Sequence, residues 1–473
     1  MDDYGSYDAL GLADLIKRGE VTALEVVDAA ISAIEQINPG LNALIYETFD
    51  HARGQVAEGV PDGPFHGVPY AIKELGSMWQ GQPQTSCCPY FRDVVAQKDS
   101  VLNQRLKEAG VILVGSTNAP EMGWALTTEP AMYGRTNNPW KEGISPGGSS
   151  GGAAAAVAAR LLPVAEASDG AGSIRGPASQ CGLVGLKPCR GRTTRAPFEA
   201  DFFYGGAQFL CVSRTVRDTA AFLDVTAGSL PGDPYNTPPP ARPWREEVGA
   251  DPGRLRIGFT TTAPHDRAVH PELVEAVVAT ADLLAELGHQ VEEHALAVDA
   301  DEVWRVYTQV VAVQNAMVFD QAAQRIGRSV AADDVAPTVF ATIERGRSLS
   351  GVQHSIDVER VRVFSREIAS DLAAYDVYLT PTLTQPPRPF GFWDMSEPDY
   401  DAYNAKWTDG VYLFLFNVSG QPAMSLPLHW SADGLPIGVQ LVGRPTDEAT
   451  LIRVAAQLEA VRPWIDQRPP VSA

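Results

Sequence analysis

Apolar and polar positions in the first 55 residues follow the period of a helix. Thr22 and Glu25 form a capping box at the start of an apolar stripe with steps of three and four residues: Leu24, Val27, Ile31 and Ile34. The helix-breaking segment 38–40, Asn-Pro-Gly, is expected to end that helix. The pattern therefore predicts packing helices over residues 1–55.

Short apolar runs and longer helical patterns alternate through the rest of the chain, which is typical of an α/β layered fold. Buried strands are expected at 67–72, 111–115, 164–168, 255–260, 290–293 and 377–379. Helices are expected at 101–109, 153–162, 271–287, 300–326, 353–374 and 446–461. The apolar segment 414–428 is interpreted as strand-turn-strand.

Two segments interrupt this alternation. Residues 228–254 are rich in proline and predict an extended surface connection. Residues 381–410, rich in Pro, Trp and Tyr, are interpreted as a loop or lid. Because no internal repeat and no second core is visible, residues 1–473 are predicted to form a single domain.

The composition argues against some classes of binding partner for this domain. With 37 Lys and Arg against 58 Asp and Glu, the net charge is −21, which argues against nucleic acid and anionic membranes. No apolar run approaches the ~20 residues of a membrane-spanning helix, and the first residues lack the pattern of a secretion signal. A cytoplasmic protein is expected, and its five cysteines, without a ladder spacing, are interpreted as buried thiols rather than metal ligands.

The segment 145–176 carries the candidate chemistry. Ser149 and Ser173 lie 24 positions apart in two glycine-rich turns, joined by the expected helix 153–162 and strand 164–168. Ten helical residues climb about 15 Å, and five or six extended residues return about 16–20 Å. The two turns should therefore lie side by side, with two hydroxyls facing a cluster of backbone N–H donors, as a nucleophile with an oxyanion hole requires.

Other motifs fit this segment poorly. A phosphate-binding loop needs a lysine after the glycines, and none is present. The glycine spacing of 170–176 is one residue too long for a dinucleotide fingerprint. Residues 147–151 match the GxSxG nucleophile elbow, but no strand precedes them. Lys73, after the apolar run 67–72, is either a surface cation or a functional residue at a strand end.

Five motifs carry a resemblance to a known family. Segments 67–73, 145–152, 168–175, 181–188 and 417–423 together resemble the amidase signature family. The resemblance implies an α/β fold with a large mixed β-sheet covered by helices on both faces. Through segments 127–130 and 434–440, the chain looks most similar to those members that hydrolyse the cyclic dimer of 6-aminohexanoate, a nylon by-product.

The resemblance also implies a set of catalytic roles. Ser173 would be the nucleophile, Ser149 would relay its proton, and Lys73 would be the base, with a cis peptide bond before Ser149. The N–H groups of Gly170, Ala171, Gly172 and Ser173 would line the oxyanion hole. A lysine can act as a base when burial makes it neutral, and this chemistry needs no metal or organic cofactor.

Five further residues are expected to contact the substrate, and one cation is not. The expected substrate contacts are Glu121, Met122, Trp124, Asn417 and Gln421. Arg175 is interpreted as a structural cation beside the loop. Trp124 stands where the cyclic-dimer hydrolases look to have a small polar residue, so the acyl side of the cleft is expected to be apolar.

Three functions are weighed. The leading hypothesis is hydrolysis of linear or cyclic amides with apolar groups, among them nylon oligomers, anilides and carbamates. The second is an amidotransferase A-type subunit that delivers ammonia within a complex, although that family usually has an acidic residue where this chain has Gly410. The third is an inactive binding scaffold. The expected partner is a small or oligomeric amide, and a homodimer is left open.

Overall fold

The computed structural model describes residues 1, 3–264 and 267–473. In its first half the chain forms α1 (Ala9–Lys17), α2 (Ala23–Leu41), β1 (Leu44–Glu47), α3 (Phe49–Glu58), β2 (Pro69–Lys73), α4 (Val101–Glu108), β3 (Ile112–Thr117), α5 (Gly151–Ala158), β4 (Val164–Asp169), α6 (Arg175–Cys181), β5 (Val184–Lys187), β6 (Gln208–Ser213) and α7 (Val216–Thr226). The second half forms β7 (Arg256–Phe259), α8 (Pro271–Glu286), β8 (Gln290–Glu293), α9 (Ala300–Ile326), α10 (Pro337–Ser348), α11 (Gly351–Asp371), β9 (Val377–Pro381), α12 (Tyr400–Asn404), α13 (Val411–Ser419), β10 (Ala423–Trp430), β11 (Pro436–Gly443) and α14 (Glu448–Val461).

A mixed eight-stranded sheet forms the centre of the molecule, in the order β4-β6-β5-β10-β11-β9-β7-β8. Strand β7 pairs in parallel with β8 and β9, whereas the other pairs in this sheet are antiparallel. The two halves of the chain therefore share one sheet, joined where β5 meets β10. A smaller sheet, β1-β3-β2, lies beside it and carries Lys73 at the end of β2.

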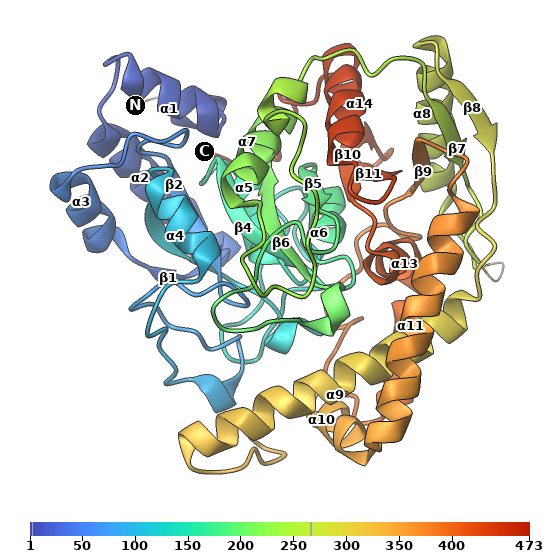
Figure 1. The fold of residues 1–473 in the computed structure, drawn as a ribbon. Coiled ribbons are helices and arrows are strands. Elements are labelled where there is room, and N and C mark those ends of the chain that lie inside the picture. Colours follow the sequence, from blue (N-terminus) through green and yellow to red (C-terminus); the bar gives the residue numbers. More distant parts are fainter. Residues whose placement is uncertain (2, 265–266) are drawn as a thin grey trace.

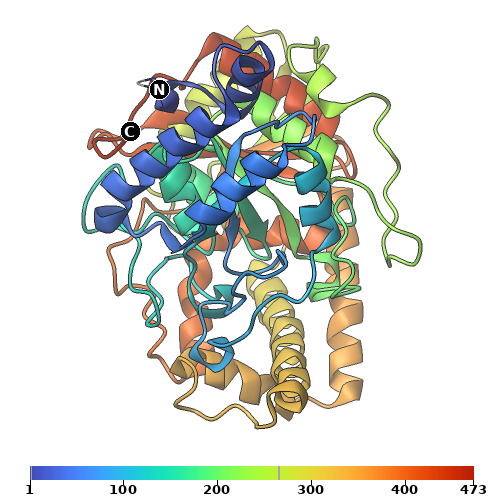
Figure 2. The same ribbon diagram turned by 90° about the vertical axis from the view of Figure 1, so that its left-hand side faces the viewer.

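Helices cover both faces of the large sheet, as predicted. A Cβ at Gly438 of β11 would meet Ser179 of α6, and one at Gly443 would meet Leu451 of α14. These two glycines are five residues apart in a strand that is buried throughout, so they face opposite sides. Figures 1 and 2 show α1–α3 on the side of the molecule that carries the small sheet, and α9, α10 and α11 projecting from one end of the large sheet.

The N-terminal prediction needs two corrections. Helix α2 begins at its predicted capping box but continues through Pro39 to Leu41. The Asn38 side chain accepts from the N–H groups of Ala43 (2.8 Å) and Leu44 (3.0 Å), which satisfies the backbone beyond the helix. The segment beyond Asn42 is the edge strand β1, not a helix, because its backbone pairs with β3.

The C-terminal prediction was wrong in one place. Residues 414–419, the start of the expected strand-turn-strand 414–428, belong to helix α13, which is buried throughout. An unbroken apolar run has no period that separates a buried helix from a strand. Gly420, with φ 75°, ends this helix, and β10 follows as expected. The segment 381–410 also contains α12, and α10 was not predicted.

No helix in the described part of the chain is long and apolar enough to cross a membrane.

Candidate active site

Three loop ends bring the predicted polar residues together. Lys73 is the last residue of β2, Ser149 precedes α5, and Ser173 lies between β4 and α6. The Lys73 ammonium nitrogen Nζ donates to the Ser149 hydroxyl at 2.7 Å and to the Ser168 hydroxyl at 3.0 Å. The lysine is 1% exposed. The structure therefore places Lys73 as a buried residue at a strand end and excludes a surface cation.

The two serine turns lie side by side, as the segment lengths predicted. The N–H of Ser150 donates to the carbonyl of Ser173 at 3.3 Å, and Ser149 and Ser173 both line one cleft. The Gly148–Ser149 peptide bond is cis, as the resemblance implied. Gly148 packs closely against the neighbouring backbone because it has no side chain. A Cβ there would lie 2.3 Å from two backbone carbonyl oxygens.

The environment of Lys73 favours its neutral form. Burial lowers the pKa of Lys73 to about 7, and the nearby carboxylates of Glu166 and Asp169 oppose that shift. Within the described residues, the side chains that accept from the amine are hydroxyl groups, which do not require it to be charged. A substantial fraction of Lys73 is therefore unprotonated at neutral pH and can accept a proton.

A buried ion pair fixes the loop that carries Ser173. Asp169 accepts from Arg175 Nε at 2.9 Å and Nη2 at 3.0 Å, and both side chains are fully buried. Asn417 donates to the Asp169 carboxylate at 2.8 Å and accepts from Arg175 at 2.6 Å. Burial alone would raise the pKa of Asp169, but Arg175 holds it well below its usual range. Arg175 is thus structural, as predicted.

Two side-chain donors orient the backbone of this loop. Asn417 donates to the carbonyl of Asp169 at 3.0 Å, and the Tyr307 hydroxyl of α9 donates to the carbonyl of Gly170 at 2.6 Å. Because C=O and N–H point in opposite directions across a trans peptide, these contacts fix the directions of the next two N–H groups, those of Gly170 and Ala171.

One member of the expected oxyanion hole is corrected. The N–H of Gly172 donates to the Asp169 carboxylate at 2.7 Å and is therefore already occupied. Gly170, Ala171 and Ser173 line the cleft, whereas Gly172 packs against Leu413 behind it. The remaining candidate donors are the N–H groups of Gly170, Ala171 and Ser173.

The cleft has a volume of about 780 Å³ and extends from the serines to α9. Its lining is rich in aromatic side chains, among them Trp124, Phe198, Phe202, Phe203, Trp304 and Trp407. Met122 and Trp124 lie in this lining, as expected of substrate contacts. The indole N–H of Trp124 has no hydrogen-bond partner within the described residues.

Three expected substrate contacts lie elsewhere. Glu121 is buried, accepts from the N–H of Ala336 at 3.0 Å and holds the segment before α10. Asn417 supports the Asp169–Arg175 pair, as above. Gln421 donates to the carbonyl of Gly443 at 2.9 Å in the turn before β10. These polar groups satisfy protein backbone or charges and do not line the cleft.

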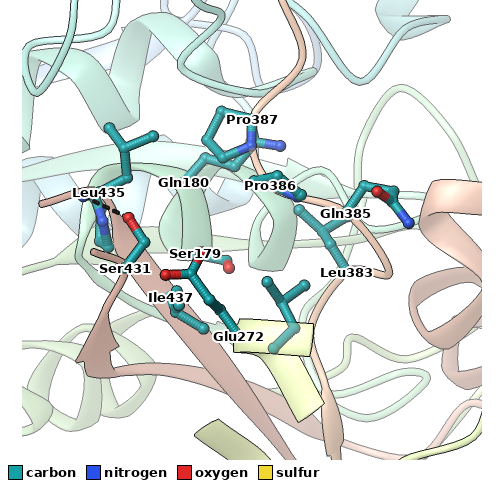
Figure 3. Close-up of a pocket in the computed structure, with 12 residues that line it drawn as sticks. Ser179, Gln180, Glu272, Leu383, Gln385, Pro386, Pro387, Ser431, Leu435 and Ile437 are labelled. Carbon is teal, nitrogen blue, oxygen red and sulfur yellow. Dashed lines mark hydrogen bonds between the residues drawn. The ribbon is translucent and has the colours of Figure 1, made fainter. Parts of the chain in front are cut away.

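A second, much smaller pocket shares no lining residue with the cleft (Figure 3). It lies among α6, the start of α8 and the β10–β11 turn, with Gln180, Glu272 and Ser431 on its walls. Its volume of about 20 Å³ is room for one water molecule. This pocket contains none of the predicted site residues and is too small for a substrate.

Two residues of the site were not assigned from the sequence. Ser168 accepts from the Lys73 amine and lies in segment 168–175, one of the segments that carry the family resemblance, so its place directly before Asp169 was the available signal. Tyr307 lies within a long helix whose apolar positions do not distinguish it from core residues. Among the described residues, no three His, Cys, Asp or Glu side chains are grouped as a metal site requires.

The comparisons with known proteins agree with this geometry. The family model described as Amidase matches residues 25–452. The chain therefore belongs to the amidase signature family and is a hydrolase of amide bonds.

Within that family the chain is similar to the 6-aminohexanoate-cyclic-dimer hydrolase of Paenarthrobacter ureafaciens, at 38% identity over 98% of this chain and 96% of the relative. It is also 32% identical to an acylamidase of Rhodococcus erythropolis, with the same coverage of each chain. A solved structure of 6-aminohexanoate cyclic dimer hydrolase superposes with a TM-score of 0.94 at 37% identity, covering 99% of both chains. A bacterial aryl acylamidase superposes with a TM-score of 0.86 at 26% identity, covering 97% of this chain and 96% of the other. The resemblance and the fold inferred from the sequence are confirmed.

Proposed function

We propose that the protein hydrolyses amides through an acyl-enzyme on Ser173, with Ser149 as proton relay and Lys73 as base. The observation that carries this proposal is the buried Lys73 amine, 2.7 Å from the Ser149 hydroxyl and with a pKa lowered by burial to about 7. A serine hydroxyl becomes nucleophilic only when a neighbour removes its proton. This neutral lysine supplies the acceptor.

In the first half-reaction the Ser173 oxygen attacks the amide carbon. Its proton passes to Ser149, while Ser149 passes its own proton to Lys73. The C–N bond then breaks, and the departing amine takes the proton from Lys73 through Ser149. In the second half-reaction a water molecule attacks the ester carbon and loses its proton through Ser149 to Lys73. The bond to Ser173 then breaks, the Ser173 oxygen takes that proton back from Lys73 through Ser149, and the acid is released.

The N–H groups of Ala171 and Ser173 are assigned to the oxyanion formed in both steps, with Gly170 as a further donor. Two contacts support this assignment. The Tyr307 hydroxyl fixes the Gly170 carbonyl and thereby the direction of the Ala171 N–H, and the Gly172 N–H already donates to Asp169. Each such donor typically contributes about 2.7–4 kcal/mol to the transition state.

The substrate class is inferred from the cleft. Its volume of about 780 Å³ is in the usual range for small-molecule sites, and its aromatic walls favour amides with apolar or aromatic groups. The panel to test consists of nylon oligomers, anilides and carbamates. It covers the cyclic-dimer and acylamide substrates in the names of the two relatives.

An amidotransferase role has less support. This chain has Gly410 where the amidotransferase subunits usually have an acidic residue. A Cβ at this position would lie 3.3 Å from Leu126 and 3.4 Å from Trp407, so a carboxylate side chain would be buried there. Hydrolysis by the chain purified alone would decide between the two functions.

The test is labelling by a fluorophosphonate together with turnover of the amide panel. Ser173→Ala and Lys73→Ala should each abolish turnover and labelling without loss of the folded state, and mass spectrometry should place the adduct on Ser173. Ser179→Ala is the matched control, because Ser179 is also 6% exposed but belongs to the other pocket. Retained turnover in either catalytic variant would refute the proposal.

A further inference from the structure

The cleft follows one face of helix α9, the long helix at the lower edge of the molecule in Figure 1. The residues of α9 that line the cleft are Trp304, Tyr307, Thr308, Val311, Asn315, Val318, Gln321, Ala322, Arg325 and Ile326. Apart from adjacent pairs they recur at steps of three and four residues, which places them on a single helix face. At a rise of about 1.5 Å per residue this face is roughly 30 Å long, so the cleft is elongated.

Asn315 is a buried amide in an apolar stretch of this face. Tyr307 marks the catalytic end of the face, because its hydroxyl donates to the Gly170 carbonyl at 2.6 Å. Asn315 lies eight residues further on, which is about 12 Å along the helix axis. Its neighbours on the cleft face are Val311 and Val318, and it is itself 3% exposed. A polar side chain at such a place is costly unless its donors and acceptors find partners.

Hydrogen bonding determines which end of the Asn315 amide is free. Its Nδ2 donates to the carbonyl of Val311, one turn earlier in α9, at 2.9 Å. Because a backbone carbonyl can only accept, this contact identifies the NH2 group and leaves the oxygen Oδ1 on the other side of the amide. No described residue donates to Oδ1, and this atom is not cut off from solvent. Oδ1 is therefore an acceptor that is open to the cleft.

We propose that Asn315 is a specificity-determining residue whose Oδ1 accepts a hydrogen bond from a second N–H group of the substrate. The substrate class is then an amide that carries a further amide N–H on an otherwise apolar chain, as an oligoamide does. An extended chain advances about 3.3–3.6 Å for every three bonds, so about 12 Å corresponds to about ten bonds from the scissile carbonyl. The inference rests on the proposed hydrolysis at Ser173 and adds the substrate feature that is selected.

The test compares pairs of amides that differ in one group. The first compound of each pair has a second amide N–H on an apolar chain, and in the other compound CH2 replaces that N–H. The spacing between this group and the scissile carbonyl is shorter than, equal to or longer than about ten bonds, on the acyl side in one set and on the amine side in another. Mass spectrometry of the products ensures that only cleavage of the intended bond is counted.

The native chain should favour the N–H compound near the matching spacing. We expect its kcat/KM to be about 2- to 13-fold higher than that of the CH2 compound, the factor that one hydrogen bond typically represents. At the shortest spacings the two compounds should be equal, because the second N–H does not reach Asn315.

Asn315→Leu removes the acceptor and keeps the size of the side chain. The ratio of kcat/KM within each pair should fall to about one, while the CH2 compounds are hydrolysed as by the native chain. Gln309→Met is the matched control. Gln309 is also a buried amide of α9, 5% exposed, whose NH2 donates to the carbonyl four residues earlier, that of Arg305, at 3.4 Å, but it does not line the cleft. Its ratio should equal that of the native chain.

A native ratio of about one at every spacing would overturn the inference, and this measurement needs no variant. A ratio that stays high in Asn315→Leu would overturn it too; if that variant does not fold, Asn315→Ala removes the same oxygen and the same loss is expected. Fluorophosphonate labelling of Ser173 without hydrolysis of any of these compounds also contradicts the inference. Absence of both labelling and hydrolysis would instead overturn the proposed function itself.

Discussion

Replacing Tyr307 by Phe tests whether the Tyr307 hydroxyl orients the loop that carries Ser173 and the proposed oxyanion donors. Tyr307 lies on α9, is 1% exposed, and its hydroxyl donates to the Gly170 carbonyl at 2.6 Å. The substitution removes one oxygen atom and retains the ring, which packs edge-on against Phe203. The Gly170 carbonyl then loses its donor, and the peptide that presents the Ala171 N–H loses the contact that fixes its direction.

The magnitude follows from what is lost. Leaving one buried acceptor without its partner costs about 1–3 kcal/mol, while complete loss of an oxyanion donor costs about 2.7–4 kcal/mol. Because Asp169 still anchors the Gly172 N–H and Asn417 still holds the Asp169 carbonyl, the loop should loosen without collapse. We expect kcat to fall about 5- to 150-fold, the factor that 1–3 kcal/mol represents. KM should change less, because the cleft walls remain.

The assay is steady-state hydrolysis of the best amide in the panel, with thermal unfolding measured in parallel. Tyr378→Phe is the matched control, because Tyr378 is 2% exposed and its hydroxyl donates to the His294 carbonyl at 2.7 Å, outside the cleft lining. Both variants should lose similar stability, and only Tyr307→Phe should lose kcat. Equal kcat in the two variants would refute the reasoning that Tyr307 orients the oxyanion donors.

Three further predictions concern charge, stability and substrate fit. Because burial lowers the pKa of Lys73 to about 7 and a base must be unprotonated, kcat/KM should rise as pH increases through about 7, and a profile that falls there would contradict this. Asp169→Asn leaves the buried Arg175 charge without its partner and should cost about 3–5 kcal/mol in urea unfolding, whereas Glu292→Gln, from an exposed pair, should leave the urea midpoint nearly unchanged. Trp124→Ala removes one aromatic wall of the cleft, so KM for amides with apolar groups should rise about 10-fold or more, the effect of losing about 1.5 kcal/mol of apolar contact, and an unchanged KM would exclude that contact.

The sequence was sufficient to predict the serine turns but not the roles of several polar residues. The lengths of one helix and one strand determine where two turns meet, and the structure places Ser150 against Ser173. The direction of a polar side chain follows no such rule. Asn417 lies in a recognisable motif, yet its amide is 0% exposed and serves Asp169, Arg175 and the Gly206 carbonyl at 2.9 Å. A sequence shows that such a residue is polar and leaves open whether it faces a ligand or the backbone beneath it.

The same limit explains the errors in the fold. Helix α13 lies in an apolar run that fits strand and helix equally well, and its type is decided by packing against α9 and α11. Strand β1 is too short to show alternation and forms because β3 presents an open edge. Elements with a period or a capping signal, such as α2 and α8, were predicted close to their observed bounds, apart from the extension of α2 through Pro39.

Three buried basic residues differ in the partners that their side chains have. Arg175 is paired with a carboxylate and stays charged. Lys187 is as deeply buried as Lys73, and burial lowers its pKa to about 7 too, but it donates to the carbonyls of Pro188 (2.9 Å) and Gln421 (2.7 Å). A carbonyl group has no proton to give. Lys73 alone among the three donates to hydroxyl groups, and those hydroxyls line the cleft. Burial therefore lowers the pKa of both lysines, and of these two only Lys73 has hydroxyl partners in the cleft, which is why the proposed mechanism uses it as the base.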